Sequence, residues 1–182
     1  ELEYETIWAL GAHCGIFNLD TTIKANEICD DYGIDTMSSG YSVGFAMELY
    51  ERGIISQRDT EGIDLKFGDE EALMSIIEQI AFRRGFGEIF AEGSRNAAER
   101  IGKGSDRCVM QVKGLEMSAY EPRAFYGIGL AFATSSRGAC HNVGGWTIRD
   151  ELIQKKVDRF AVKGKGILVK TLQDVRGYID AI

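Results

Sequence analysis

The sequence has no excess of positive charge and no long apolar run. Its 182 residues include 21 lysines and arginines against 28 aspartates and glutamates, which gives a formal net charge of −7 and a pI near 5.0. A chain without a basic face binds phosphate backbones poorly, so we expect no nucleic-acid partner. No run approaches the roughly 18 apolar residues that span a bilayer, and no export signal opens the chain. The sequence predicts a globular protein outside the membrane.

Cysteine and proline are scarce. The four cysteines are Cys14, Cys29, Cys108 and Cys140. They are too few and too widely spaced for a disulfide framework, so we expect a cytoplasmic protein. Proline occurs once, at Pro122, whereas the 22 glycines make up about 12% of the chain. We therefore expect helices that end at glycine rather than at proline.

Several catalytic motifs are also missing. The sequence has no GxGxxG after a strand, no GxxxxGK[ST], no HExxH and no GxSxG. These absences remove the usual support for a nicotinamide-dependent enzyme, a P-loop protein or a serine hydrolase. The chain also begins at Glu1 without a methionine and stops at Ile182 inside an apolar helical pattern. We expect it to be a piece of a longer protein.

Helical periodicity dominates what is present. Apolar residues at helical spacing predict a mainly α, multihelical fold with at most one short β segment. Asp20, Asp69 and Gly33 carry cap signals, the first two as N-caps and the glycine as a helix end. The expected helices are 20–32, 37–52, 70–84, 87–101, 124–133 and, with an interruption at 164–166, 150–182. The expected strand is 107–113.

Both histidines adjoin a cysteine, as His13-Cys14 and Cys140-His141. These four side chains could form a zinc site, although paired zinc ligands are normally two to four residues apart. Buried structural roles for the cysteines are the competing interpretation. His141 follows a stretch of small residues and is a candidate for proton transfer, or else a structural histidine.

Two groups of carboxylates are further candidates. Glu3-Tyr4-Glu5 combines acids with a phenol, which suits a proton relay or simply an exposed helix start. Asp30, Asp31 and Asp35 surround Gly33 at a predicted helix end. Carboxylates there can accept hydrogen bonds from the amino and ring N–H groups of a heterocycle, or act as ordinary caps and turn residues.

Short segments along nearly the whole chain resemble the aldehyde:ferredoxin oxidoreductase family. The segments, in order, are Glu3 to Thr6, Leu10-Gly11, Cys14 to Ile16, Lys24 to Gly40, Gly62 to Gly68, Ala91 to Gly93, Lys113 to Glu116, Glu121 to Ala124 and Arg137 to His141. The resemblance implies that residues 1–110 form the second, helical domain of the family. It further implies that 111–182 are a glycine-rich segment facing the cofactor and the start of the third domain, and that a β-rich N-terminal domain and the C-terminal end are absent.

The resemblance also implies cofactors. Members hold tungsten, or sometimes molybdenum, between two pterins, as in a tungsten-bis(molybdopterin), beside a 4Fe-4S cluster that passes electrons to ferredoxin. The family's pterin motif DxxGL[CD] is matched by Asp30, Gly33, Ile34 and Asp35, with isoleucine in place of leucine. A second copy would begin at Asp180. The cluster ligands would lie outside this chain, and none of its four cysteines is expected to bind the cluster or a metal.

For the chemistry, the resemblance assigns Tyr4, Glu5 and His141 to the metal's neighbourhood. Glu5 would take a proton from an attacking water, and His141 would donate a hydrogen bond to the aldehyde oxygen. The implied reaction converts an aldehyde and water to a carboxylic acid, with the remaining domains of the polypeptide required and the chain inactive alone. The resemblance also allows the protein to be a homodimer.

Some alternatives stay open at this stage. The substrate could be a simple aldehyde, formaldehyde, a sugar-phosphate aldehyde or the aromatic thioester of ring-reducing relatives, and the metal could be tungsten or molybdenum. The chain could instead be a stand-alone helical module that binds pterin or docks to a separate cofactor subunit, without catalysis.

Overall fold

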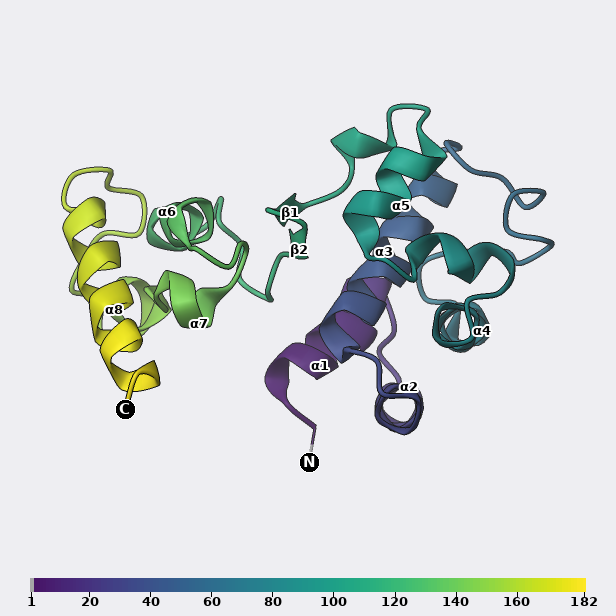
Figure 1. The fold of residues 1–182 in the computed structure, drawn as a ribbon, viewed down its shortest axis with the longest axis horizontal. Coiled ribbons are helices and arrows are strands. Elements are labelled where there is room, and N and C mark those ends of the chain that lie inside the picture. The colour runs from purple at the N-terminus through teal and green to yellow at the C-terminus, as the bar shows by residue number, and fades with distance from the viewer. Residues whose placement is uncertain (1) are drawn as a thin grey trace. The chain divides into compact units, whose positions relative to one another are not determined.

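The computed structural model describes residues 2–182, and the chain divides after Met110 into two compact units (Figure 1). We call the part through Met110 unit 1 and Gln111–Ile182 unit 2. The regular structure of both units is almost entirely helical, so the predicted mainly helical class is confirmed. The predicted assignment of the two segments to the second and third family domains remains a prediction.

Unit 1 consists of α-helices joined by short 3-10 turns. Its elements are α1 (Tyr4–Leu10), η1 (Ala12–Cys14), α2 (Leu19–Tyr32), α3 (Thr36–Glu51), α4 (Glu70–Ala81), η2 (Gly85–Phe90), α5 (Ser94–Ile101) and η3 (Ser105–Arg107). Helix α3 is the central element, buried over most of its length, and α1 packs along it (Figure 1). Its burial on all sides explains why the sequence of α3 shows little amphipathic contrast.

The helix ends of unit 1 follow from capping chemistry. Asp69 caps α4, its carboxylate accepting a hydrogen bond from the Ala72 N–H at 2.9 Å, which confirms the predicted N-cap. Gly33 ends α2 in the left-handed region with a φ of 67°, also as predicted. The predicted cap at Asp20 is wrong. Asn18 caps α2, and its Oδ1 accepts from the Asp20 N–H at 3.1 Å.

Two other expectations for this region need correction. The helix predicted over 87–101 is split, because Gly93 adopts a φ of 86° and separates η2 from α5. The strand predicted over 107–113 is shorter, because Arg107 belongs to η3. Only β1 (Gln111–Val112) is extended, and it pairs antiparallel with β2 (Leu115–Glu116) in a small hairpin that opens unit 2. Its two turn residues both have positive φ, as such tight hairpins require.

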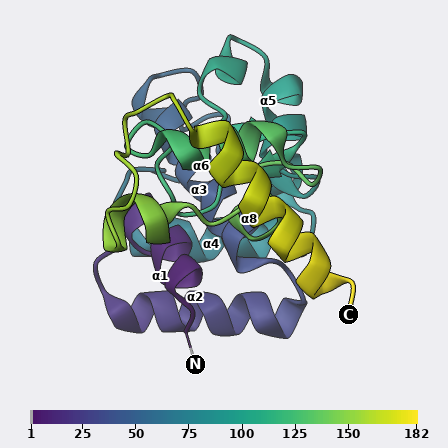
Figure 2. The ribbon, with the colours of Figure 1, turned by 90° about the vertical axis from the view of Figure 1, so that its left-hand side faces the viewer.

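Unit 2 contains α6 (Tyr126–Thr134), α7 (His141–Gly144), the π-helical turn η4 (Arg149–Ile153) and α8 (Lys165–Asp180). Helix α8 lies beside α6, as Figure 2 shows in yellow and green. A core of Ile128, Phe132, Ala139 and Ile148 lies within this unit. Many large apolar side chains of α8 remain exposed, among them Ile167 and Tyr178. No helix within residues 2–182 is long and apolar enough to cross a membrane.

The helix predicted from Asp150 onward forms only in part. After η4, residues 154–164 are irregular and return to the helical state at Lys165. The irregular segment is closed by a buried ion pair between the Lys165 ammonium and the Glu151 carboxylate. Glu151 also accepts from the Thr147 hydroxyl at 2.6 Å and from the Gly127 N–H at 3.0 Å. This network fixes the connection between η4 and α8.

Candidate functional site

The corner between α2 and α3 holds the four residues predicted to bind a pterin. The Gly33 N–H donates to the Asp30 carbonyl at 3.2 Å, and the Ile34 N–H donates to the Cys29 carbonyl at 2.9 Å. These bonds close the end of α2 and reverse the chain into α3. The structure therefore brings Asp30, Gly33, Ile34 and Asp35 together in one tight corner.

The carboxylates of this corner are both exposed to solvent. Asp30 accepts one hydrogen bond from the Asn26 side chain, at 2.9 Å. Asp35 caps α3, and its Oδ1 accepts from the Ser38 N–H at 2.6 Å. A carboxylate has about four acceptor positions on its two oxygens. Each therefore retains the capacity to accept further N–H groups from a ligand.

A hollow of about 220 Å³ adjoins the corner. Its lining residues are Ile34, Asp35, Ser38, Ser39, Ser42, Ile80, Phe90, Ala91 and Gly93. The wall is therefore part hydroxyl and part apolar, with a carboxylate at the edge. Such a lining suits a flat heterocycle that has N–H groups at its rim.

Tyr4 and Glu5 lie in the first turn of α1. Tyr4 is 60% exposed and Glu5 is half-buried. Tyr4 lines a groove of about 300 Å³ with a mainly apolar wall that includes Ile7, Trp8 and Phe17. The phenol is thus placed at the mouth of an apolar surface groove, where it can contact a ligand.

A hydrogen bond joins the start of α1 to the start of α3. The hydroxyls of Thr6 and Thr36 are 2.9 Å apart. Thr6 follows Glu5 and Thr36 follows Asp35, so the predicted catalytic acid and the predicted pterin corner belong to neighbouring helix ends. This contact could not be predicted from local sequence patterns, since thirty residues separate the two threonines.

The other predicted pair in unit 1, His13 and Cys14, has a structural environment. The Cys14 thiol donates to the carbonyls of Ala9 and Gly40, each at 3.3 Å, and burial raises its pKa to about 12. A thiol held in the protonated state is a poor zinc ligand. The His13 ring lies between Trp8 and Tyr41, with ring centroids 4.6 and 5.0 Å away.

The alternative zinc site gains no support from the structure. Its four candidate ligands are divided between the units, with His13 and Cys14 in unit 1 and Cys140 and His141 in unit 2. In the part of the chain that the structure describes, no group of three or more His, Cys, Asp or Glu side chains is arranged to hold a metal ion. Cys14, Cys29 and Cys140 are buried thiols.

His141 begins α7 and is held among polar and aromatic partners. Its Nδ1 lies 3.2 Å from the hydroxyl of the buried Ser118, and its ring meets the Tyr120 ring edge-on at 4.7 Å. Burial, and secondarily the positive charge of Arg176, lower the pKa of His141. The imidazole is therefore neutral near pH 7, where it can donate one N–H and accept at its other nitrogen.

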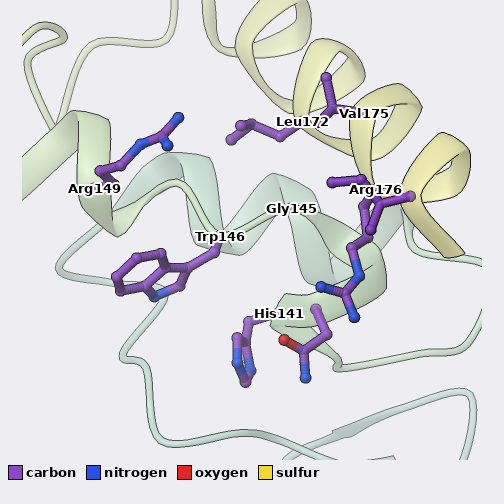
Figure 3. A pocket seen from close by; sticks show the side chains of 9 residues that line it. His141, Gly145, Trp146, Arg149, Leu172, Val175 and Arg176 are labelled. Atoms are coloured by element: carbon purple, nitrogen blue, oxygen red, sulfur yellow. The ribbon is translucent and has the colours of Figure 1, made fainter.

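A cavity of about 360 Å³ opens beside His141, entirely within unit 2 (Figure 3). It is lined by His141, Asn142, Gly145, Trp146, Arg149, Leu172, Val175, Arg176 and Ile179. The sequence did not predict a functional role for Ser118, Trp146 or Arg176. The richness of residues 114–149 in glycine and aromatics was the available signal for a lined site.

Asp180, the start of the predicted second pterin motif, is the last residue of α8. It is exposed, and its carboxylate pairs with the Arg176 guanidinium one turn earlier, at 3.0 Å. Asp180 and His141 thus both belong to unit 2, whereas Tyr4, Glu5 and the corner at Asp30 belong to unit 1.

Known proteins resemble the chain over most of its length. The model of the family described as aldehyde ferredoxin oxidoreductase, domains 2 & 3, matches residues 1–182. The tungsten-containing aldehyde ferredoxin oxidoreductase of Pyrococcus abyssi is 42% identical over 98% of the chain, and that of Thermococcus kodakarensis is 40% identical over the same share. A protein of Pyrococcus furiosus named aliphatic sulfonate oxidoreductase, WOR-like subunit, is 34% identical over 76% of the chain.

The chain spans about 30% of the length of the two aldehyde oxidoreductases and matches 23% of the sulfonate oxidoreductase subunit. The match to the family model nevertheless covers every residue of the chain. The chain therefore belongs to the aldehyde ferredoxin oxidoreductase family, and its match lies in the region described as domains 2 & 3.

Proposed function

We propose that the chain forms the helical part of a tungsten- or molybdenum-dependent pterin oxidoreductase that oxidises aldehydes to carboxylic acids. The observation that carries the proposal is the 42% identity to a tungsten-containing aldehyde ferredoxin oxidoreductase over 98% of the chain. Electrons would leave through a 4Fe-4S cluster to ferredoxin, with the cluster ligands in the remaining domains. We choose aldehydes over sulfonates because the sulfonate oxidoreductase subunit is less similar and matches less of the chain.

The α2–α3 corner supports pterin binding by its chemistry. Asp30 and Asp35 are exposed carboxylates with acceptor capacity left, and Gly33 has no atom within 4 Å of where a Cβ would stand. A pterin ring presents amino and ring N–H groups that pair well with carboxylates. We assign Asp30, Gly33, Ile34 and Asp35 to the first pterin and Asp180 to the second. When bound, the metal and its pterins supply the redox chemistry.

The chain's own residues would manage protons and orientation. Glu5 would accept a proton from the water that adds to the aldehyde carbon, and Tyr4 would position a ligand at the groove it lines. His141, neutral near pH 7, would donate an N–H to the aldehyde oxygen as negative charge develops there. Ser118 would hold the imidazole in place through the 3.2 Å contact with Nδ1.

Cofactor analysis of the complete enzyme tests this proposal. Asp30→Asn removes the negative charge at the corner, and we expect it to lower pterin and tungsten content severalfold. Asp31→Asn is the matched control, because Asp31 is an exposed carboxylate in the same last turn of α2 but occupies a variable position of the motif.

Equal cofactor content in the two variants would remove the corner from pterin binding. Wild-type enzyme that contains pterin but no tungsten, molybdenum or cluster would favour the alternative of a binding module without catalysis.

A further inference from the structure

The cavity beside His141 carries two guanidinium groups at its edges. Arg176 projects from α8, and in Figure 3 its guanidinium points toward the α7 side of the cavity, where His141 lies. Arg149 lies on the other side, beside Trp146. Both side chains are about half exposed, so they are accessible to a ligand from solvent.

Neighbouring carboxylates offset only part of the positive charge of Arg149 and Arg176. The Arg149 Nε lies 3.7 Å from an Asp150 oxygen, and the Arg176 Nε donates to Asp180 at 3.0 Å. A guanidinium has five N–H donors in a fixed fork, so the pairing through Nε leaves the terminal nitrogens able to bind an anion.

The net charge of unit 2 is positive, like that of the two guanidinium groups. It contains 11 lysines and arginines against 7 aspartates and glutamates, whereas unit 1 contains 10 and 21. The chain is acidic as a whole, yet the unit that holds this cavity is basic. A basic unit with guanidinium groups at a cavity favours anionic ligands.

Most of the remaining lining is apolar, although His141 and Asn142 add polar groups. Leu172 and Val175 of α8 lie on one side of the cavity, and the Trp146 indole lies on another (Figure 3). Ile179 of the same helix also lines the cavity. An apolar wall beside a guanidinium suits a small organic anion better than an inorganic one, because the wall can contact a carbon skeleton.

We propose that this cavity is a carboxylate-binding subsite, in which Arg176 holds the anionic group and Trp146, Leu172 and Val175 contact the adjoining carbon chain. The inference rests on the proposed aldehyde oxidation, which supplies two sources for such a group. The carboxylate is either that of the product acid or a second acidic group on the substrate. Arg176 is thus a residue for specificity.

Calorimetric titration of the complete enzyme with propionate tests the subsite without turnover. Wild-type enzyme should bind propionate and not its neutral analogue propionamide. Arg176→Met should weaken propionate binding about ten- to hundredfold, since a charge-assisted hydrogen bond is lost, and Arg176→Lys should retain part of it. The matched control is Lys170→Met, which removes a cation on the same helix that also pairs with an acid four residues on.

Steady-state kinetics distinguish the two sources of the carboxylate, the product acid and a second acidic group on the substrate. If the substrate's acid binds here, Arg176→Met lowers the ratio of kcat/KM for succinate semialdehyde to kcat/KM for propionaldehyde about tenfold. If the product carboxylate binds here, the inhibition constant for propionate rises about tenfold and that ratio stays constant. Lys170→Met should change neither quantity.

Equal propionate binding by the wild type, Arg176→Met and Lys170→Met would overturn the subsite. Loss of pterin from Arg176→Met but not from Arg176→Lys would overturn it too, because the anion held would then be the cofactor's phosphate. A wild-type enzyme that binds propionate through Arg176 but oxidises no aldehyde would contradict the proposed function and leave the carboxylate subsite standing.

Discussion

The hydroxyls of Thr6 and Thr36 are 2.9 Å apart and join the first turns of α1 and α3. Thr6 is buried, so the contact is shielded from water. Each threonine directly follows a residue of the proposed site, Glu5 and Asp35 respectively. The bond therefore fixes the helix end that carries the proposed proton acceptor against the helix end that carries a proposed pterin ligand.

We expect Thr6→Val to lower turnover of the complete enzyme about three- to tenfold while pterin and tungsten content stay normal. Valine keeps the shape of threonine but loses the hydrogen bond, which is worth about 1 kcal/mol. The acidic limb of the pH profile of kcat should shift if Glu5 is repositioned. Thr171→Val, on the exposed side of α8, is the control and should match the wild type.

Glu5→Gln should lower kcat about a hundredfold or more, because the amide cannot accept a proton from water. Metal and pterin content should not change. Glu3→Gln is the matched control, since Glu3 is an exposed carboxylate two residues away whose side chain does not cap α1. Turnover by Glu5→Gln equal to that of Glu3→Gln would exclude Glu5 as the proton acceptor.

His141→Ala should also lower kcat, by about a hundredfold, through the loss of a hydrogen-bond donor to the developing negative charge. Ser118→Ala should have a smaller effect of the same kind, because it removes only the contact that orients the ring. Steady-state kinetics with cofactor analysis separates these effects. Full activity of His141→Ala would limit the residue to a structural role.

The buried pair of Lys165 and Glu151 predicts a large stability effect in unit 2. Lys165→Met leaves the Glu151 carboxylate buried without its cation, a change that typically costs about 3–5 kcal/mol. Hydrogen exchange should show faster opening at the Gly127 N–H, which donates to Glu151. Lys170→Met, which breaks an exposed pair on the same helix, should leave that exchange unchanged. Equal exchange in the two variants would contradict this role for the pair.

The stability of unit 1 should fall in mild acid because of His13. Burial lowers the pKa of His13 in the folded state, so the unfolded chain binds the proton more readily. The contribution of His13 is then complete above the unfolded pKa of about 6.5 and is lost as the pH falls below it, by at most about 1.4 kcal/mol per pH unit. Urea unfolding of the chain between pH 7.5 and 5.5 measures this. His13→Gln should show a shallower pH dependence, and an unchanged slope would contradict the argument.

Gly44 of α3 explains how the His13 ring can pack against that helix. A Cβ at residue 44 would stand 2.5 Å from the His13 ring, so only glycine leaves room for the imidazole against α3. The predicted helix over 37–52 includes Gly44, but the sequence could not reveal which residue packs against it. Close approaches between elements depend on tertiary packing, which local periodicity does not encode.

Cap chemistry and helical spacing were enough to predict much of the fold. Asp69 caps the start of α4 and Gly33 ends α2, as their residue types favour. The corner at Asp30 forms from residues that are adjacent in sequence. The failures occur where distant contacts override local preference. Residues 154–164 are irregular, and the Lys165–Glu151 pair that closes this segment is a distant contact that no periodic pattern predicts.

The geometry of the candidate site could be predicted from the sequence only in part. That Asp30, Gly33 and Asp35 lie in one corner could be expected because they are close in sequence. The positions of Ser118 and Arg176 could not be expected, because each lies more than twenty residues from His141 and is brought near it only by the packing of unit 2.

Aldehyde-dependent reduction of ferredoxin by the purified complete enzyme tests the central claim most directly. Each aldehyde oxidised should yield one carboxylic acid and release two electrons, measured as reduced ferredoxin. We expect that ratio with at least one aldehyde in enzyme that contains tungsten or molybdenum. Enzyme with its full content of metal, pterin and cluster that forms no acid from any aldehyde tested would contradict the account.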